Sequence, residues 1–112
     1  MEEFSAPAIT ILQIQRTVAN YYKIRMADLR GSKRHRAISM PRQIAMYLSR
    51  KHTGQSYSAI GWAFGRKHYS TAITAHRKIG RERAAKPYLD RVLTTLEQLL
   101  LSSATPATPE GE

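Results

Sequence analysis

The 112-residue sequence contains no cysteine and no long apolar run. Without cysteine it can form neither a disulfide framework nor a thiolate metal site, which fits a reducing compartment. No stretch approaches the roughly 18 apolar residues needed to cross a bilayer. The acidic start MEEFSAPA also lacks the basic and apolar regions of a signal peptide. We therefore expect a soluble intracellular protein, located in the cytoplasm.

Residue patterns that carry catalysis are also missing. The few acidic residues give no basis for a catalytic carboxylate pair, and no glycine-rich loop has the spacing that cradles a nucleotide phosphate. The pattern of serines and histidines does not indicate a catalytic triad. The histidines include no His-x3-His pair, and His68 and His76 would lie about 12 Å apart on one helix. We expect no enzyme, no metal site and no cofactor in a chain whose length fits one small domain.

Acidic residues are scarce between the two ends of the chain. The sequence has 18 Lys plus Arg and 8 Asp plus Glu, and four of these acids are Glu2, Glu3, Glu110 and Glu112. The intervening residues therefore carry 18 bases against four acids, a formal charge of +14. A small domain with this charge attracts polyanions and releases their counterions. Nucleic acid is the leading expected partner, ahead of an anionic membrane surface or an acidic protein.

Apolar residues recur at helical spacing in five segments, and no segment alternates over enough residues to form a strand. The predicted helices are ITILQIQRTVANYYKI, SMPRQIAMYLSRKHT, SYSAIGWAFG, the STAITAHRKI stretch that follows it, and PYLDRVLTTLEQLLL. Ser39 and Ser56 are the expected N-caps of the second and third helices, with Pro41 in the first turn after Ser39. The chain is therefore expected to be all-α.

Three further segments connect or flank these helices. RMADLRG predicts a helical turn that ends at Gly31, and GSKRHR after it should form a solvated loop. SSATPATPEGE has small residues, prolines and no periodicity, which predicts a disordered tail. We expect a domain over residues 9–102, between a flexible N-terminus at 1–8 and a tail at 103–112.

The apolar stripe of each helix should face one core. The expected inward-facing residues are Ile11, Ile14, Val18, Tyr21, Tyr22, Ile44, Tyr47, Leu48, Ile60, Phe64, Ala72, Ala75, Ile79, Leu89, Val92, Leu96 and Leu99. Leu93 and Leu100 widen the stripe of the last helix. This broad leucine face either closes the core or forms a homodimer contact.

A short helix, a glycine turn and a helix with a polar face together form the pattern of a helix-turn-helix. The polar face carries no acid, and its members are Ser70, Thr74, Arg77, Lys78 and Arg81. His68 and Tyr69 precede it at the N-terminal end, where recognition helices present side chains to base edges. The spacing alone also fits an ordinary solvated basic face. The loop GSKRHR similarly fits either a flexible polyelectrolyte or an arm that inserts an arginine into a minor groove.

Five segments resemble, in order and nearly in spacing, the C-terminal DNA-binding domain of DnaA, the bacterial chromosomal replication initiator. They are VANYYKIRMADLRG, SKRHR, PRQIAMYLSRKHT, IGWAFG and STAITAHRKI. The similarity runs from about Ile11 to Leu100. It implies a Trp-repressor-like helical bundle containing a helix-turn-helix, which binds double-stranded DNA at replication origins and some promoters.

The resemblance also implies which residues meet DNA. Arg34 would enter the minor groove, while Arg42 and Gln43 would meet the DNA backbone or nearby bases, Arg42 from the first turn of its helix. Ser70 and Thr71 match the hydroxyl pair of the family, and Thr74 matches another base-proximal position. The full expected set is Lys33, Arg34, Arg36, Arg42, Gln43, Arg50, Lys67, His68, Tyr69, Ser70, Thr71, Thr74, Arg77 and Lys78.

The sequence departs from the family at its reading positions. Where the family usually has GGRDH[ST]T, an ungapped alignment gives GRKHYST, with His68 at the aspartate and Tyr69 at the histidine. A local gap would instead align His68 with the family histidine. The length also leaves no room for the ATPase domain of an initiator. We expect a sequence-specific regulator of transcription or replication; the alternatives are a nucleoid-type protein that coats DNA by charge, and an excised initiator fragment.

Overall fold

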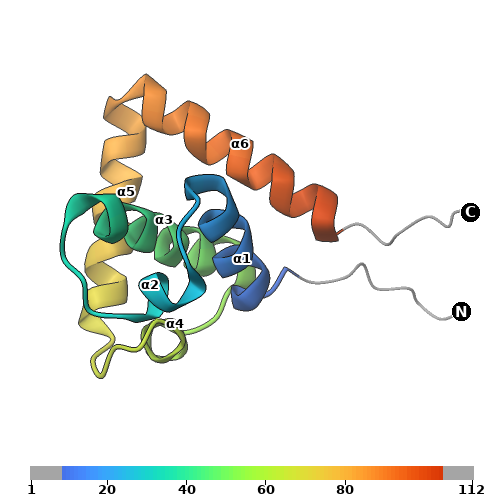
Figure 1. Ribbon diagram of the computed structural model, residues 1–112. Coiled ribbons are helices and arrows are strands. Elements are labelled where there is room, and N and C mark those ends of the chain that lie inside the picture. The colour runs from blue at the N-terminus through green and yellow to red at the C-terminus, as the bar shows by residue number, and fades with distance from the viewer. Residues whose placement is uncertain (1–8, 105–112) are drawn as a thin grey trace, which may run out of the picture.

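The computed structural model describes the backbone of residues 9–104 and the side chains of residues 9–102. In this part of the chain helices are joined by short turns and loops, and there are no strands (Figure 1). The helices are α1 (Ile11–Tyr22), α2 (Met26–Arg30), α3 (Arg36–Thr53), α4 (Tyr57–Ala63), α5 (Ser70–Ala85) and α6 (Pro87–Ala104). The predicted all-α bundle is confirmed.

Local capping fixes the start of α1, because the side chain of Thr10 accepts from the Gln13 backbone while the Gln13 side chain accepts from the Thr10 backbone. Ile14 and Val18 are buried as expected, whereas Tyr21 is 40% exposed rather than inward-facing. Gln15 and Ala19, one helical turn apart, complete the buried face of α1, and Tyr21 lies outside it.

α3 begins earlier than expected, with its N-cap four residues before Ser39. His35 is the N-cap, and its carbonyl oxygen accepts from the backbone nitrogens of Ile38 and Ser39, both at 2.9 Å. Ser39 is therefore inside the helix, and Pro41 lies in the second turn, not the first. The longer helix buries Ile38, which is 6% exposed, and this apolar burial explains why the helix begins early.

The core forms around α3, which packs against α1, α2, α4 and α5, while α6 packs against α1 and α5 (Figure 1). Buried residues on α6 are Leu89, Leu93, Leu96 and Leu100, so α6 closes the core. Leu99 was expected to face inward but is 45% exposed, because it lies one residue away from the buried row at helical spacing.

α6 continues to Ala104, two residues into the segment expected to be a tail. The rest of that segment, and the segment 1–8, lie outside the described residues.

An ionic cluster ties α6 to α3 and α5. The carboxylate of Glu97 accepts from Lys51 Nζ and Arg83 Nη2, both at 2.8 Å, and lies 2.7 Å from His52 Nε2. Burial by itself would raise the pKa of Glu97, but hydrogen bonds from Arg83, Lys51 and His52 lower the pKa to about 2. Glu97 is therefore ionised at neutral pH and anchors α6 through charge-assisted bonds.

Candidate nucleic-acid interface

The helix-turn-helix consists of α4, the turn 64–69 and α5. Ser56 caps α4, since its hydroxyl accepts from the Ala59 backbone nitrogen at 3.0 Å. Gly65 has φ +74°, and a Cβ at this position would collide with the carbonyl oxygen of Arg30. Position 65 therefore requires glycine for two reasons: the backbone is left-handed there, and the turn passes close to the end of α2.

Two faces of α5 differ sharply. Ala72, Ala75 and Ile79 are buried against the bundle, as their spacing predicts. The other face is open to solvent at Ser70, Thr71, Thr74, Arg77 and Arg81, while Lys78 is partly buried. The helix thus projects short hydroxyls from its N-terminal half and cations farther along.

His68 and Tyr69 lie in the turn, directly before the first residue of α5. The carbonyl oxygen of Tyr69 accepts from the backbone nitrogens of Ala72 and Ile73, so its backbone already belongs to the helix start. Its ring is 57% exposed. Within the described residues neither the Tyr69 hydroxyl nor the His68 ring has a hydrogen-bond partner, which leaves both available to a ligand. Lys67, before them, is likewise exposed.

A shallow groove of about 250 Å³ runs between α3 and α5. It is lined by Gln43, Ser70, Thr71, Thr74 and Ala75. The Gln43 Oε1 atom is buried and accepts no hydrogen bond from the described residues. Leaving such an oxygen unpaired costs about 1–3 kcal/mol. Because the atom is buried, a donor in the groove could reach it only after the Gln43 side chain rotates.

The loop 31–35 reaches the same region (Figure 1). Ser32, Arg34 and Thr71 line a second groove of about 370 Å³, together with Arg42 and Arg66. The structure therefore brings the basic loop beside the start of α5, although the two segments are far apart in the sequence.

The side chains of the loop differ in what they contact. Lys33 Nζ lies 3.4 Å from Asp28 Oδ1, and Asp28 also accepts from Arg25. Hydrogen bonds from the Arg25 backbone and side chain contribute most to lowering the pKa of Asp28 to about 2. Arg34 and Arg36 are exposed and form no ion pair with the part of the chain described.

Arg42 lines the second groove, but most of its side chain is buried and its guanidinium is bonded within the protein. Its side chain is 5% exposed, and its guanidinium donates to three backbone carbonyls between residues 28 and 33. Because α3 begins at Arg36, Arg42 lies in the second turn of the helix and faces α2, not solvent. Burial, and then the charge of Arg66, lower the pKa of Arg42.

Arg50 is also committed to contacts within the bundle. Its Nη1 donates to the carbonyl oxygen of Gln55 at 2.9 Å, and its guanidinium carbon lies 4.2 Å from the centre of the Tyr57 ring. Tyr57 in turn hydrogen-bonds His76 Nδ1 at 3.0 Å. Arg50 therefore stabilises the junction of α3, α4 and α5, and it is only partly available to a ligand.

Arg66 is a residue of this surface that was absent from the expected set. Its Nη1 donates to the carbonyl oxygen of Gly31 at 2.8 Å, from the helix-turn-helix turn to the basic loop. The available signal was its place directly before Lys67 and His68, both of which were in the expected set.

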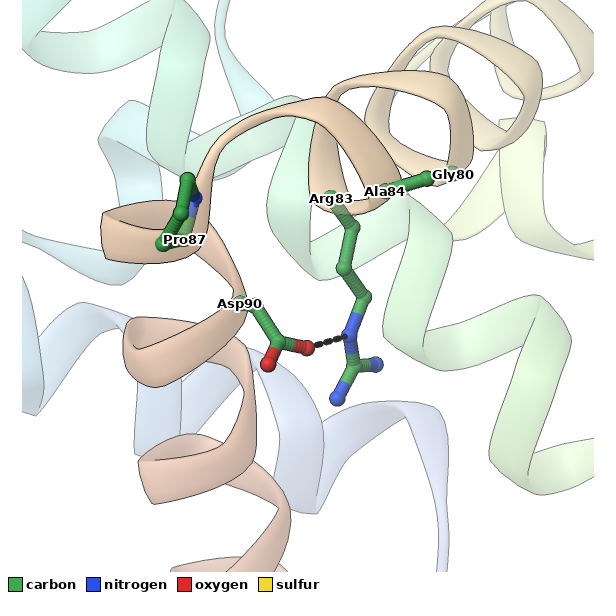
Figure 2. A pocket seen from close by; sticks show the side chains of 5 residues that line it. All are labelled: Gly80, Arg83, Ala84, Pro87 and Asp90. Carbon is green, nitrogen blue, oxygen red and sulfur yellow. Dashed lines mark hydrogen bonds and ion pairs between the residues drawn. The ribbon is translucent and has the colours of Figure 1, made fainter.

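A larger pocket, of about 480 Å³, lies at the junction of α5 and α6 (Figure 2). Arg83 and Asp90 point toward each other there, with Nε and Oδ1 2.7 Å apart. The other four N–H groups of Arg83 are taken by Tyr47, Thr94 and both oxygens of Glu97. Arg83 therefore has no donor left for a ligand in this pocket.

The described residues contain neither a metal-binding cluster nor a membrane-spanning helix. No three His, Asp or Glu residues come together there to hold a metal ion. No helix in that part of the chain combines the length and apolarity that crossing a membrane requires.

Comparison with known proteins gives a consistent result. Residues 11–79 match the model of the bacterial DnaA protein helix-turn-helix family. The chain is 47% identical over 92 residues to the chromosomal replication initiator protein DnaA of Nitrosomonas eutropha, covering 82% of this chain and 20% of that protein. It is 42% identical over 93 residues to the DnaA of Magnetococcus marinus, covering 83% and 21%. The chain thus spans about a fifth of the length of the curated relatives it matches.

A solved structure also matches the bundle. The crystal structure of a DNA replication initiation factor superposes with a TM-score of 0.75 at 35% sequence identity. The match covers 84% of this chain and 29% of that one.

Proposed function

The chain belongs to the bacterial DnaA helix-turn-helix family, and from this membership we propose that it binds double-stranded DNA, with α5 in the major groove. The observation that carries the proposal is one continuous surface formed by the start of α5, the Gln43 groove and the basic loop. None of the residues lining the two grooves is acidic. A duplex can therefore approach without placing a carboxylate against phosphate.

Base reading is assigned to the N-terminal end of α5. Ser70, Thr71 and Thr74 are short and exposed, so the helix backbone can approach the groove floor closely. His68 and Tyr69 add larger groups with free hydrogen-bonding atoms. These two side chains offer different donors and acceptors from an aspartate and a histidine, so the sequence preferred by this chain should differ from that of its relatives.

Backbone and minor-groove contacts are assigned to the cations around this centre. Arg34 has no acidic partner in the described chain and can enter a narrow minor groove, where the potential is most negative. Phosphate contacts are assigned to Lys33, Arg36, Lys67, Arg77 and Lys78. Gln43 is assigned to the groove that it lines with Ser70 and Thr71, where a rotation of its side chain would bring its unpaired amide oxygen toward a base or a bridging water.

The physiological role follows from this binding. We propose a non-enzymatic regulator of transcription or of replication, with residues 9–102 as its DNA-binding unit. Binding to chromosomal DNA would also make it nucleoid-associated. The formal charge of +10 for the whole chain favours one competing function, the coating of DNA without regard to sequence.

Selection of bound duplexes from a random pool, at near-physiological salt, separates these two functions. Sequence-specific reading predicts an enriched motif, and Thr71→Ala or Thr74→Ala should lower discrimination by about 1–3 kcal/mol per lost base contact. Arg16→Ala, which removes an exposed cation from α1, is the matched control and should leave the motif unchanged. Recovery of no motif would support coating by charge alone.

A homodimer through the C-terminal helix is a separate proposal. Leu99 is exposed and lines a groove of about 350 Å³ with Thr17, Asn20 and Tyr21 on α1. Analytical ultracentrifugation tests it: a monomer at high protein concentration would exclude the dimer, whereas a dimer lost in Leu99→Glu would support it.

A further inference from the structure

The backbone of the basic loop is held by a side chain from α3. Arg42 donates from Nε to the carbonyl oxygen of Leu29 at 3.2 Å, and from Nη2 to that of Asp28 at 2.8 Å. Its Nη1 donates to the carbonyl oxygen of Lys33, also at 2.8 Å. One buried guanidinium therefore joins the last residues of α2 to the middle of the loop, and fixes the span between them.

A second arginine attaches the loop to the helix-turn-helix. Arg66 Nη1 donates to the carbonyl oxygen of Gly31, and the adjacent Gly65 packs directly against the carbonyl of Arg30. The turn before α5 thus contacts two successive carbonyls at the start of the loop.

These contacts restrain the loop backbone but leave its reading side chain free. Arg34 directly follows Lys33, whose carbonyl is bonded by Arg42, and lies three residues after Gly31, whose carbonyl is bonded by Arg66. Arg34 itself remains exposed. A flexible loop would lose conformational entropy when Arg34 entered a groove, whereas a loop already ordered in the free protein has lost it before binding.

We propose that Arg42 and Arg66 are positioning residues, which hold the loop 31–35 against the helix-turn-helix so that Arg34 and α5 approach the two grooves of DNA as one rigid unit. This inference rests on the proposed function for its consequence in binding. The ordering of the loop itself is a property of the free protein and does not depend on DNA.

The first experiment therefore uses the free, full chain. Backbone 15N relaxation and amide exchange of residues 31–35 are compared in the unmodified protein, Arg66→Ala and the control Arg16→Ala. We expect an ordered loop in the unmodified protein and the control, and faster loop motion in Arg66→Ala with the helices unchanged. If the loop is equally mobile, or equally ordered, in all three proteins, Arg66 does not hold it in place. That result would overturn the proposal whether or not the chain binds DNA.

The second experiment separates positioning from direct phosphate contact. Affinities for the selected duplex are measured for Arg34→Ala, Arg66→Ala and the double variant across a range of salt concentrations. Positioning predicts that Arg66→Ala weakens binding by about three- to tenfold when Arg34 is present and has little further effect when Arg34 is absent. The proposal would be overturned if Arg66→Ala lowered the affinity equally with and without Arg34, and reduced the slope of log affinity against log salt by the amount expected for one lost phosphate contact.

Arg42→Lys is the matched variant for the buried member of the pair. It keeps the charge, but an ammonium cannot reproduce the three-way fork of the guanidinium. We expect a mobile loop and weaker binding that again depends on Arg34. If Arg42→Lys fails to fold, the outcome with Arg66→Ala still decides the proposal.

Discussion

Replacing Glu97 by Gln should weaken the attachment of α6 while leaving the DNA-binding surface intact. The carboxylate is a shared acceptor for Arg83, Lys51 and His52. The side chains of Arg83 and His52 are only 17% and 18% exposed, so water replaces the lost partner poorly. Glutamine keeps the shape of the side chain but removes the charge.

The magnitude follows from the pKa of Glu97, which lies at about 2 in the folded protein against an ordinary value of 4.5. A depressed pKa means that the folded state favours the ionised carboxylate. The resulting stability is fully present above pH 4.5 and is lost as the pH falls through 2. Linkage converts this difference to about 3 kcal/mol at neutral pH. For a domain of this size, that corresponds to a melting temperature lower by roughly 10–20 °C.

Thermal unfolding followed by circular dichroism between pH 7 and pH 2 tests the prediction. The difference in unfolding free energy between the unmodified protein and Glu97→Gln should be largest at neutral pH and shrink below pH 4.5. Asp90→Asn removes a more exposed partner of the same arginine and should cost under about 1 kcal/mol. A difference that stays constant over the whole pH range would refute the assignment to charge.

Three further outcomes are expected. Gly65→Ala should destabilise the fold by about 1–3 kcal/mol more than Gly54→Ala in denaturant titrations. Both glycines have positive φ, but only Gly65 lies against the last carbonyl of α2. Equal losses of unfolding free energy would show that the collision is relieved. The double substitution His68→Asp and Tyr69→His should shift the motif recovered from a random pool toward that of the family, and an unchanged motif would show that neither residue reads bases. Arg77→Ala should reduce the slope of log affinity against log salt by about 0.9 without changing the motif, and a changed motif would place Arg77 at a base.

The helices could be predicted from the sequence because helix formation depends on nearby residues. Apolar spacing located the buried faces of α4 and α5 correctly. Ser56 was expected to cap α4, and its hydroxyl does accept a hydrogen bond from the first turn of that helix. Prediction was less accurate at helix boundaries. Ser39 had the local features of an N-cap, but burial of Ile38 in the core extends α3 beyond it.

The exposure of individual side chains on a known helix face was harder to predict. Tyr21 and Leu99 fit an apolar spacing, yet both are substantially exposed. A helix has a continuous range of directions around its axis, and only the position of the neighbouring helix decides which of two adjacent apolar residues is covered. That position depends on residues distant in the sequence.

The helical class, the charge and the family could be predicted without coordinates, since they depend on composition, short-range spacing and ordered motifs. The burial of Arg42 and the contact of Arg66 with Gly31 became visible only in the folded bundle. Both arginines look like surface cations in the sequence, where their charge predicts solvent or phosphate as the partner. Their actual partners are backbone carbonyls, which every residue carries and which become specific acceptors only when the fold orients them toward a guanidinium.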